Sequence, residues 1–116
     1  MNCEIIATPL FLRNIKRLSK KYLSLRKDYG LFLSELKANP QMGIDLGGGL
    51  HKIRMRISDK NKGKSGGARV ITFTVMVASE ESRLYLVYVY DKSERENMTI
   101  DEIRFILRES GLVEYW

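Results

Sequence analysis

The chain has 116 residues, of which 44% are hydrophobic and 29% charged, and this length and composition suit a single domain over residues 1–116. No apolar run approaches the length of a membrane span, and the first residues lack the pattern of a secretory signal, so we expect neither an anchor nor a leader. The one cysteine, Cys3, excludes an internal disulfide; we expect a small buried side chain and a cytoplasmic location.

The first forty residues predict one strand and two helices. Asn2–Ala7 is a short apolar stretch typical of a strand. Thr8-Pro9 suits a helix start, and apolar residues then recur at helical spacing as far as Tyr22. Ser24–Ala38 predicts a second helix with Ser24 as its cap, ended by Asn39-Pro40. The short joint predicts an antiparallel helical pair.

The middle of the chain predicts a loop and three strands. Met42–Gly49 reads MGIDLGGG, a composition typical of a loop. In Lys52–Ile57 cations alternate strictly with apolar residues, which predicts a strand with one apolar and one cationic face. Ala68–Ala78 and Arg83–Asp91 are apolar on both faces, as central strands are, and a tight hairpin joins them. Three antiparallel strands are therefore expected.

The last element is predicted to be a helix. Thr99 and Glu102 have the spacing of a capping box, apolar residues follow at helical spacing, and Gly111 suits the C-terminal cap. The order of strand, two helices, three strands and helix predicts a layered α+β fold.

The basic charge is concentrated in one third of the chain. Residues 46–79 hold seven basic side chains and one acid, which accounts for the whole net charge of +6. A polyanion is the partner that this asymmetry predicts. The cations on Lys52–Ile57 project from one face about 6.6 Å apart, and this self-repelling row favours an anionic ligand.

The stretch Ser58–Gly67 contains Gly63-Lys64-Ser65, which looks like the tail of a phosphate-binding P-loop. That motif needs a glycine where Ser58 stands, and a helix rather than a strand after the lysine, so we reject a nucleotide site. The length of the stretch and its glycines predict instead a mobile loop that can approach a polymer backbone.

Four stretches carry a resemblance to a known family: TPLFLRNIKRLSKKY, ANPQMGIDLGGGLHKIRMRI, KGKSGGARVITF and LYLVYVYDKSEREN. Together they resemble the RelE/ParE superfamily of bacterial toxins, in its HigB/RelE-like branch. The resemblance implies a RelE-like fold, with a twisted antiparallel sheet of about four strands packed on two N-terminal helices, plus a C-terminal helix. It also implies a toxin that cleaves mRNA on the 70S ribosome, without a cofactor, and that a cognate antitoxin, expected to be a helix-turn-helix protein, keeps silent.

The resemblance implies a catalytic centre at Lys52, Arg54 and Arg69. Cleavage by the RNA 2′-hydroxyl needs a base and cations that stabilise the developing phosphorane charge. Lys52 is the candidate base, because neighbouring arginines disfavour its charged form, and the two arginines can grip phosphate oxygens. Further RNA contacts are expected from Arg56, Lys60, Lys62, Lys64, Lys92 and Arg95.

The chain departs from the family pattern after its last strand. Ser93 and Thr99 stand where some members carry an arginine and a tyrosine, which leaves no obvious general acid. His51, the one histidine, is expected to be exposed at a strand start. With one histidine and one cysteine far apart in the sequence, no metal site is expected.

Two alternatives to the ribonuclease stay open. The first is a ParE-like toxin that binds gyrase without catalysis, and the row of cations argues against it. The second is a non-catalytic RNA-binding or ribosome-binding domain. Aromatic platforms would favour that domain, but Tyr85, Tyr88 and Tyr90 lie in an expected core strand, where packing is their expected use.

Overall fold

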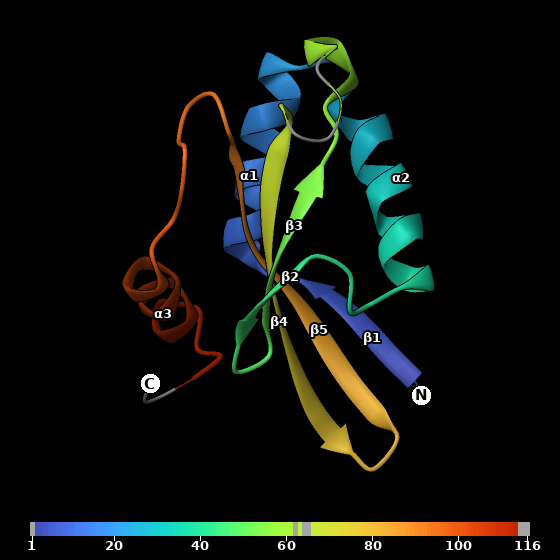
Figure 1. Ribbon diagram of the computed structural model, residues 1–116, viewed down its shortest axis with the longest axis vertical. Helices are drawn as coiled ribbons and strands as arrows, with labels where there is room; N and C mark the ends of the chain where they lie inside the picture. Colours follow the sequence, from blue (N-terminus) through green and yellow to red (C-terminus); the bar gives the residue numbers. More distant parts are fainter. Residues whose placement is uncertain (1, 62, 64–65, 114–116) are drawn as a thin grey trace.

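A computed structural model describes residues 2–61, 63 and 66–113. In this part of the chain three helices pack against a five-stranded sheet (Figure 1). The elements in chain order are β1 (Asn2–Ala7), α1 (Pro9–Lys21), α2 (Leu25–Ala38), β2 (Ile44–Gly47), β3 (Leu50–Met55), a 3-10 turn (Ser58–Lys60), β4 (Ala68–Ala78), β5 (Glu81–Asp91) and α3 (Ile100–Glu109).

The sheet has the order β1-β5-β4-β3-β2 and is mixed, since β1 runs parallel to β5 while the other pairs are antiparallel. The α+β class is confirmed, but the four-stranded antiparallel sheet needs correction. The extra strand is β2, inside the glycine-rich segment predicted to be a loop. It is only four residues long and forms by pairing with β3, Ile44 lying opposite Lys52. Local composition carries no sign of such a pairing.

Helices α1 and α2 cover one face of the sheet and run in opposite directions (Figure 1). Thr8 caps α1 as predicted, because its side chain accepts a hydrogen bond from the Phe11 amide. Ser24 occupies the cap position of α2, but its hydroxyl donates to Asp28 instead of capping. Both helices bury an apolar stripe against the sheet; its buried members are Phe11, Ile15, Leu18, Leu25, Phe32 and Leu36.

Helix α3 covers part of the opposite face. Its predicted capping box is present, with Thr99 and Glu102 each bonding the other's backbone amide, and Gly111 takes the positive φ of +72° that suits a C-terminal cap. Tyr90 is buried under this helix, and Tyr85 and Tyr88 pack beside it, as predicted. No helix in the described part of the chain is long and apolar enough to cross a membrane.

A buried carboxylate, Asp91, fixes the end of β5. Its side chain is 0% exposed and accepts hydrogen bonds from Lys60 Nζ at 2.7 Å, Lys21 Nζ at 3.2 Å and Tyr22 Oη at 2.5 Å. The amide and hydroxyl of Ser93 donate to it as well. Burial by itself would raise the pKa of Asp91, but the bonds from Lys60, Tyr22 and Ser93 outweigh it and hold the pKa well below its usual range.

The turn before β4 is anchored on α2. Both the amide and the hydroxyl of Ser58 donate to Asp28, and Ser24 and Asp59 bond each other reciprocally. Ser58, the first residue of the loop predicted to be mobile, is therefore hydrogen-bonded to α2. Lys62, Lys64 and Ser65, the middle of that loop, lie outside the described residues.

Two single residues differ from expectation. His51 is 7% exposed rather than exposed, because β2 pairs on one side of it and β4 on the other, at Asp45 and Thr72. Cys3 is half-buried, and it packs on the edge of the core under α1 and α2.

Candidate nucleic-acid interface

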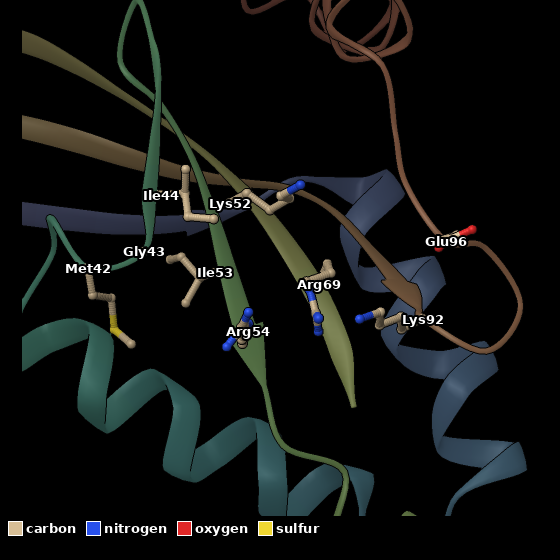
Figure 2. Close-up of a pocket in the computed structure, with 9 residues that line it drawn as sticks. All are labelled: Met42, Gly43, Ile44, Lys52, Ile53, Arg54, Arg69, Lys92 and Glu96. Atoms are coloured by element: carbon tan, nitrogen blue, oxygen red, sulfur yellow. The ribbon is translucent and has the colours of Figure 1, made fainter. Parts of the chain in front are cut away.

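A cleft of about 600 Å³ opens on the same sheet face as α3, in the part of that face that α3 leaves uncovered. Its lining comes from four separate segments: the end of the α2–β2 connection together with the first residue of β2, β3, the start of β4, and the connection that follows β5 (Figure 2). The lining residues are Met42, Gly43, Ile44, Lys52, Ile53, Arg54, Arg69, Lys92 and Glu96.

Four cations converge in this cleft. Lys52 and Arg54 come from β3, Arg69 from β4 and Lys92 from the segment after β5. Strand register places Arg54 directly opposite Arg69, so the two side chains project from the same face of the sheet. Like charges in directly opposed positions destabilise a sheet. The repulsion between Arg54 and Arg69 therefore destabilises the sheet, and a bound anion would relieve it.

Arg69 is held deep in the cleft wall and is only 6% exposed. Burial, and secondarily the charge of Arg54, lowers the pKa of Arg69. Tyr90 lies opposite Arg69 in the sheet, and burial raises the pKa of its phenol even though Arg69 and Arg95 act in the other direction. At neutral pH the site thus keeps a charged guanidinium and a neutral phenol side by side.

A residue of the β5–α3 connection orients the side chain of Lys52. Its Nζ donates to the side-chain oxygen of Asn97 at 3.2 Å. The sequence analysis did not single out Asn97, because it lies 45 residues after Lys52 and only the fold brings the two side chains together.

Two cations predicted to bind RNA lie in ion pairs. Lys60 has a side-chain exposure of 8% and points at Asp91, while Arg95 pairs with Glu102 and donates to the Asn97 carbonyl. Both therefore fix the connections around the cleft. Arg56 is exposed just beyond β3 and lines a smaller hollow that it shares with Arg54. The other two predicted contacts, Lys62 and Lys64, lie outside the described residues.

The side-chain hydroxyls of Ser93 and Thr99, the two positions that depart from the family pattern, both take part in hydrogen bonds. Ser93 donates to Asp91, and Thr99 Oγ1 accepts from the Glu102 amide. Glu96, which the sequence analysis did not single out, contributes the one carboxylate of the cleft lining within the described residues. Residues 2–61, 63 and 66–113 hold no group of three or more His, Cys, Asp and Glu side chains that could bind a metal ion.

The cleft lining also has apolar residues, which sequence reasoning missed. Met42 and Ile44 lie beside the β3 residues of the cleft (Figure 2), with Ile44 directly opposite Lys52 in the β2–β3 pairing, and Ile53 is only 2% exposed. Gly43 brings this segment against β3: it has φ +94°, and a Cβ there would lie 2.6 Å from the Lys52 carbonyl oxygen. A glycine with this geometry lets two backbones approach where a side chain would keep them apart.

We expect Gly43→Ala to destabilise the protein and to distort the cleft lining beside β3. The positive φ alone costs about 1–3 kcal/mol, and the clash with a backbone oxygen adds to it. Gly47→Ala is the matched control, since Gly47 has φ +88° with nothing within 4 Å of the added Cβ. Urea unfolding should show the larger loss for Gly43→Ala. Equal losses would mean that the close approach at Gly43 is unimportant.

One comparison with known proteins bears on this site. A family model described as "RelE toxin of RelE / RelB toxin-antitoxin system" matches residues 32–113. The match begins inside α2 and continues past α3, so it includes every residue that lines the cleft.

Proposed function

The chain belongs to the RelE toxin family, and we propose that it is a ribosome-dependent, metal-independent endoribonuclease that inhibits translation by cutting mRNA. The convergence of Lys52, Arg54, Arg69 and Lys92 in one cleft supports this most directly. Phosphoryl chemistry on RNA depends on cations placed around the reacting phosphate. A binding-only toxin has no need of two arginines opposed across a strand pair.

The proposed reaction begins with the 2′-hydroxyl of the nucleotide on the 5′ side of the cut. Lys52 takes its proton while the oxygen attacks the adjacent phosphorus, and the bond to the 5′-oxygen of the next nucleotide breaks. Arg54 and Arg69 stabilise the charge on the non-bridging oxygens. The departing oxygen needs a proton, and we propose Lys92 as its donor, since its ammonium is the remaining amine of the lining. The products carry a 2′,3′-cyclic phosphate and a 5′-hydroxyl.

The experiment is cleavage of a defined mRNA on programmed 70S ribosomes by the purified chain. Primer extension locates the cut, and end-labelling identifies the new termini. We expect a 5′-hydroxyl product, and we expect a 2′-O-methyl group at the cut nucleotide to abolish cleavage, because it removes the nucleophile. Cleavage that survives the methyl group would overturn the mechanism. If mRNA stays intact while gyrase supercoiling is inhibited, the ParE-like alternative replaces the nuclease.

Toxins of this family belong to toxin-antitoxin systems, so a cognate antitoxin is the implied partner. We propose a helix-turn-helix antitoxin that covers the cationic cleft, and we place both proteins in the cytoplasm. Acidic or apolar segments suit such a surface. Addition of the purified partner should stop mRNA cleavage, and cleavage that continues in a stable complex would place the antitoxin elsewhere.

A further inference from the structure

We propose that Asn97 is a positioning residue for the cleavage reaction. Its side-chain oxygen holds the Nζ of Lys52, so that the lone pair of the amine faces the 2′-hydroxyl of the RNA. This inference rests on the proposed function, because it takes Lys52 as the base. It goes further by giving the β5–α3 connection a part in the reaction, although Asn97 itself touches no reacting atom.

The contact between the two side chains is one hydrogen bond. The Nζ of Lys52 donates to Oδ1 of Asn97 at 3.2 Å. Within the described residues this amine makes no ion pair, although the carboxylate of Glu96 lines the same cleft. In Figure 2 the amine points away from Ile44, toward the side of the cleft that holds Lys92 and Glu96. The group that the fold brings to Lys52 is therefore an amide and not the neighbouring carboxylate.

An amide oxygen suits this task better than a carboxylate would. Lysine acts as a base only in its neutral form, with one lone pair and two N–H bonds. A carboxylate at the contact would favour the ammonium, whereas the amide of Asn97 accepts a hydrogen bond from either form and adds no charge. The amine directs one N–H to Asn97, and its lone pair takes the proton of the 2′-hydroxyl. The bond then strengthens, because its donor has become charged.

The start of α3 holds the backbone around Asn97. The Nε of Arg95 donates to the Asn97 carbonyl at 3.0 Å, and the guanidinium pairs with Glu102. The same carboxylate accepts from the Thr99 amide at 3.0 Å in the capping box of α3. Met98 is 6% exposed and packs in the core beside α3. Asn97 is thus fixed on both sides, and a fixed acceptor is what positioning of a base requires.

Other charged groups around Lys52 set the background against which a change at Asn97 is measured. On β5, Tyr88 lies on the same sheet face as Lys52, with Ile71 between them. The charged side chains that share the cleft lining with Lys52 are Arg54 on β3, Arg69 on β4, and Lys92 and Glu96 after β5. The three cations favour the neutral amine and the carboxylate favours the ammonium. A test that adds a carboxylate must therefore keep the total charge constant.

Single-turnover cleavage on programmed 70S ribosomes, with saturating protein and across a range of pH, tests the inference. Asn97→Ala should slow the saturated rate on the order of tenfold, the effect of one lost hydrogen bond. The apparent affinity for the ribosomes should change little, because Asn97 carries no charge that phosphate could bind. Asn2→Ala removes an exposed asparagine of β1 and should leave rate and affinity unchanged.

Asn97→Asp separates positioning from a merely structural role. It keeps the shape of the side chain, and its carboxylate should move the midpoint of the pH–rate profile upward by about one unit or more. The double variant Glu96→Gln/Asn97→Asp has the net charge of the wild type and should still show an upward shift, because its carboxylate lies at the contact with Lys52. A loosened fold would instead lower the rate at every pH alike.

The inference is overturned if Asn97→Ala keeps the full rate at saturation while the wild type cleaves normally. It is also overturned if the double variant has the pH profile of the wild type. Both results leave the proposed function standing. A wild type that leaves mRNA intact refutes the proposed function, and the role of Asn97 falls with it.

Discussion

Asp91→Asn should destabilise the protein by about 3 kcal/mol or more, because it leaves the buried ammonium of Lys60 without a counter-charge. Lys60 has an 8% exposed side chain and lies 2.7 Å from Asp91, so water cannot replace the lost partner. Urea unfolding at neutral pH measures the loss. Asparagine keeps the shape of the side chain, and the effect therefore reports the charge rather than a cavity.

Glu94→Gln is the matched control for this prediction. Glu94 follows Asp91 by three residues and pairs with Arg17 and Lys21, but its side chain is 35% exposed. Exposed ion pairs contribute at most about 1 kcal/mol. The double variant Asp91→Asn/Lys60→Met should recover part of the loss, since it removes the stranded charge as well. If Asp91→Asn costs no more than Glu94→Gln, Asp91 is not the centre of this network.

The same carboxylate predicts how stability depends on pH. The folded state holds the pKa of Asp91 far below its usual value of 3.8. The stabilisation is complete above the unfolded pKa and is lost as the pH falls through the folded pKa. The urea midpoint of the wild type should therefore drop below about pH 4 more steeply than that of Asp91→Asn. Parallel curves for the two proteins would contradict the assignment.

Lys52→Ala, Arg54→Ala and Arg69→Ala should each slow single-turnover cleavage on the order of a hundredfold or more, even when enzyme saturates the programmed ribosomes. A lost base or charge stabiliser acts on the chemical step, so a higher concentration cannot restore it. Arg56→Ala removes an exposed cation on the same segment and should recover the full rate at saturation, because it affects binding alone.

The fold of the variants must be checked separately for Arg69. Lys52 and Arg54 are accessible, and their loss should leave stability nearly unchanged. Arg69 is 6% exposed, and its replacement by alanine leaves a cavity where the buried side chain was. Arg69→Lys keeps a charge but loses the guanidinium fork, so it should be slow yet stable. Full rates at saturation for all three alanine variants would show that these residues bind RNA without acting in the reaction.

Local sequence patterns predicted most of the helices and strands, because their signals lie within a few residues. The Thr8 cap, the Thr99–Glu102 capping box and the alternation in Lys52–Ile57 all mark elements that the structure contains. The patterns did not predict β2 or the parallel pairing of β1 with β5. Both are long-range backbone pairings, and their partners are chosen by the packing of the whole sheet.

The cationic half of the cleft was predictable for a related reason. Lys52, Arg54 and Arg69 lie in short recognisable motifs, whereas Ile44 and Asn97 reach the cleft only through tertiary contacts. Lys60 is the opposite case, a cation for which the sequence pattern and the fold indicate different roles. Its place in a basic loop predicted an RNA contact, yet the fold gives it the buried partner Asp91. Charge patterns in a sequence show how many cations are present, not which of them the fold neutralises.

The pairing of β1 with β5 has a consequence for synthesis of the protein. The amide of Asn2 bonds the carbonyl of Glu80, and the amide of Thr8 bonds that of Leu86. Strand β1 therefore has no partner until β5 has left the ribosome, and such distant contacts form late in folding. Lys92 reaches the cleft later still. A chain that terminates before Lys92 would thus lack an assembled cleft, and synthesis has to pass this point before the four cations can meet.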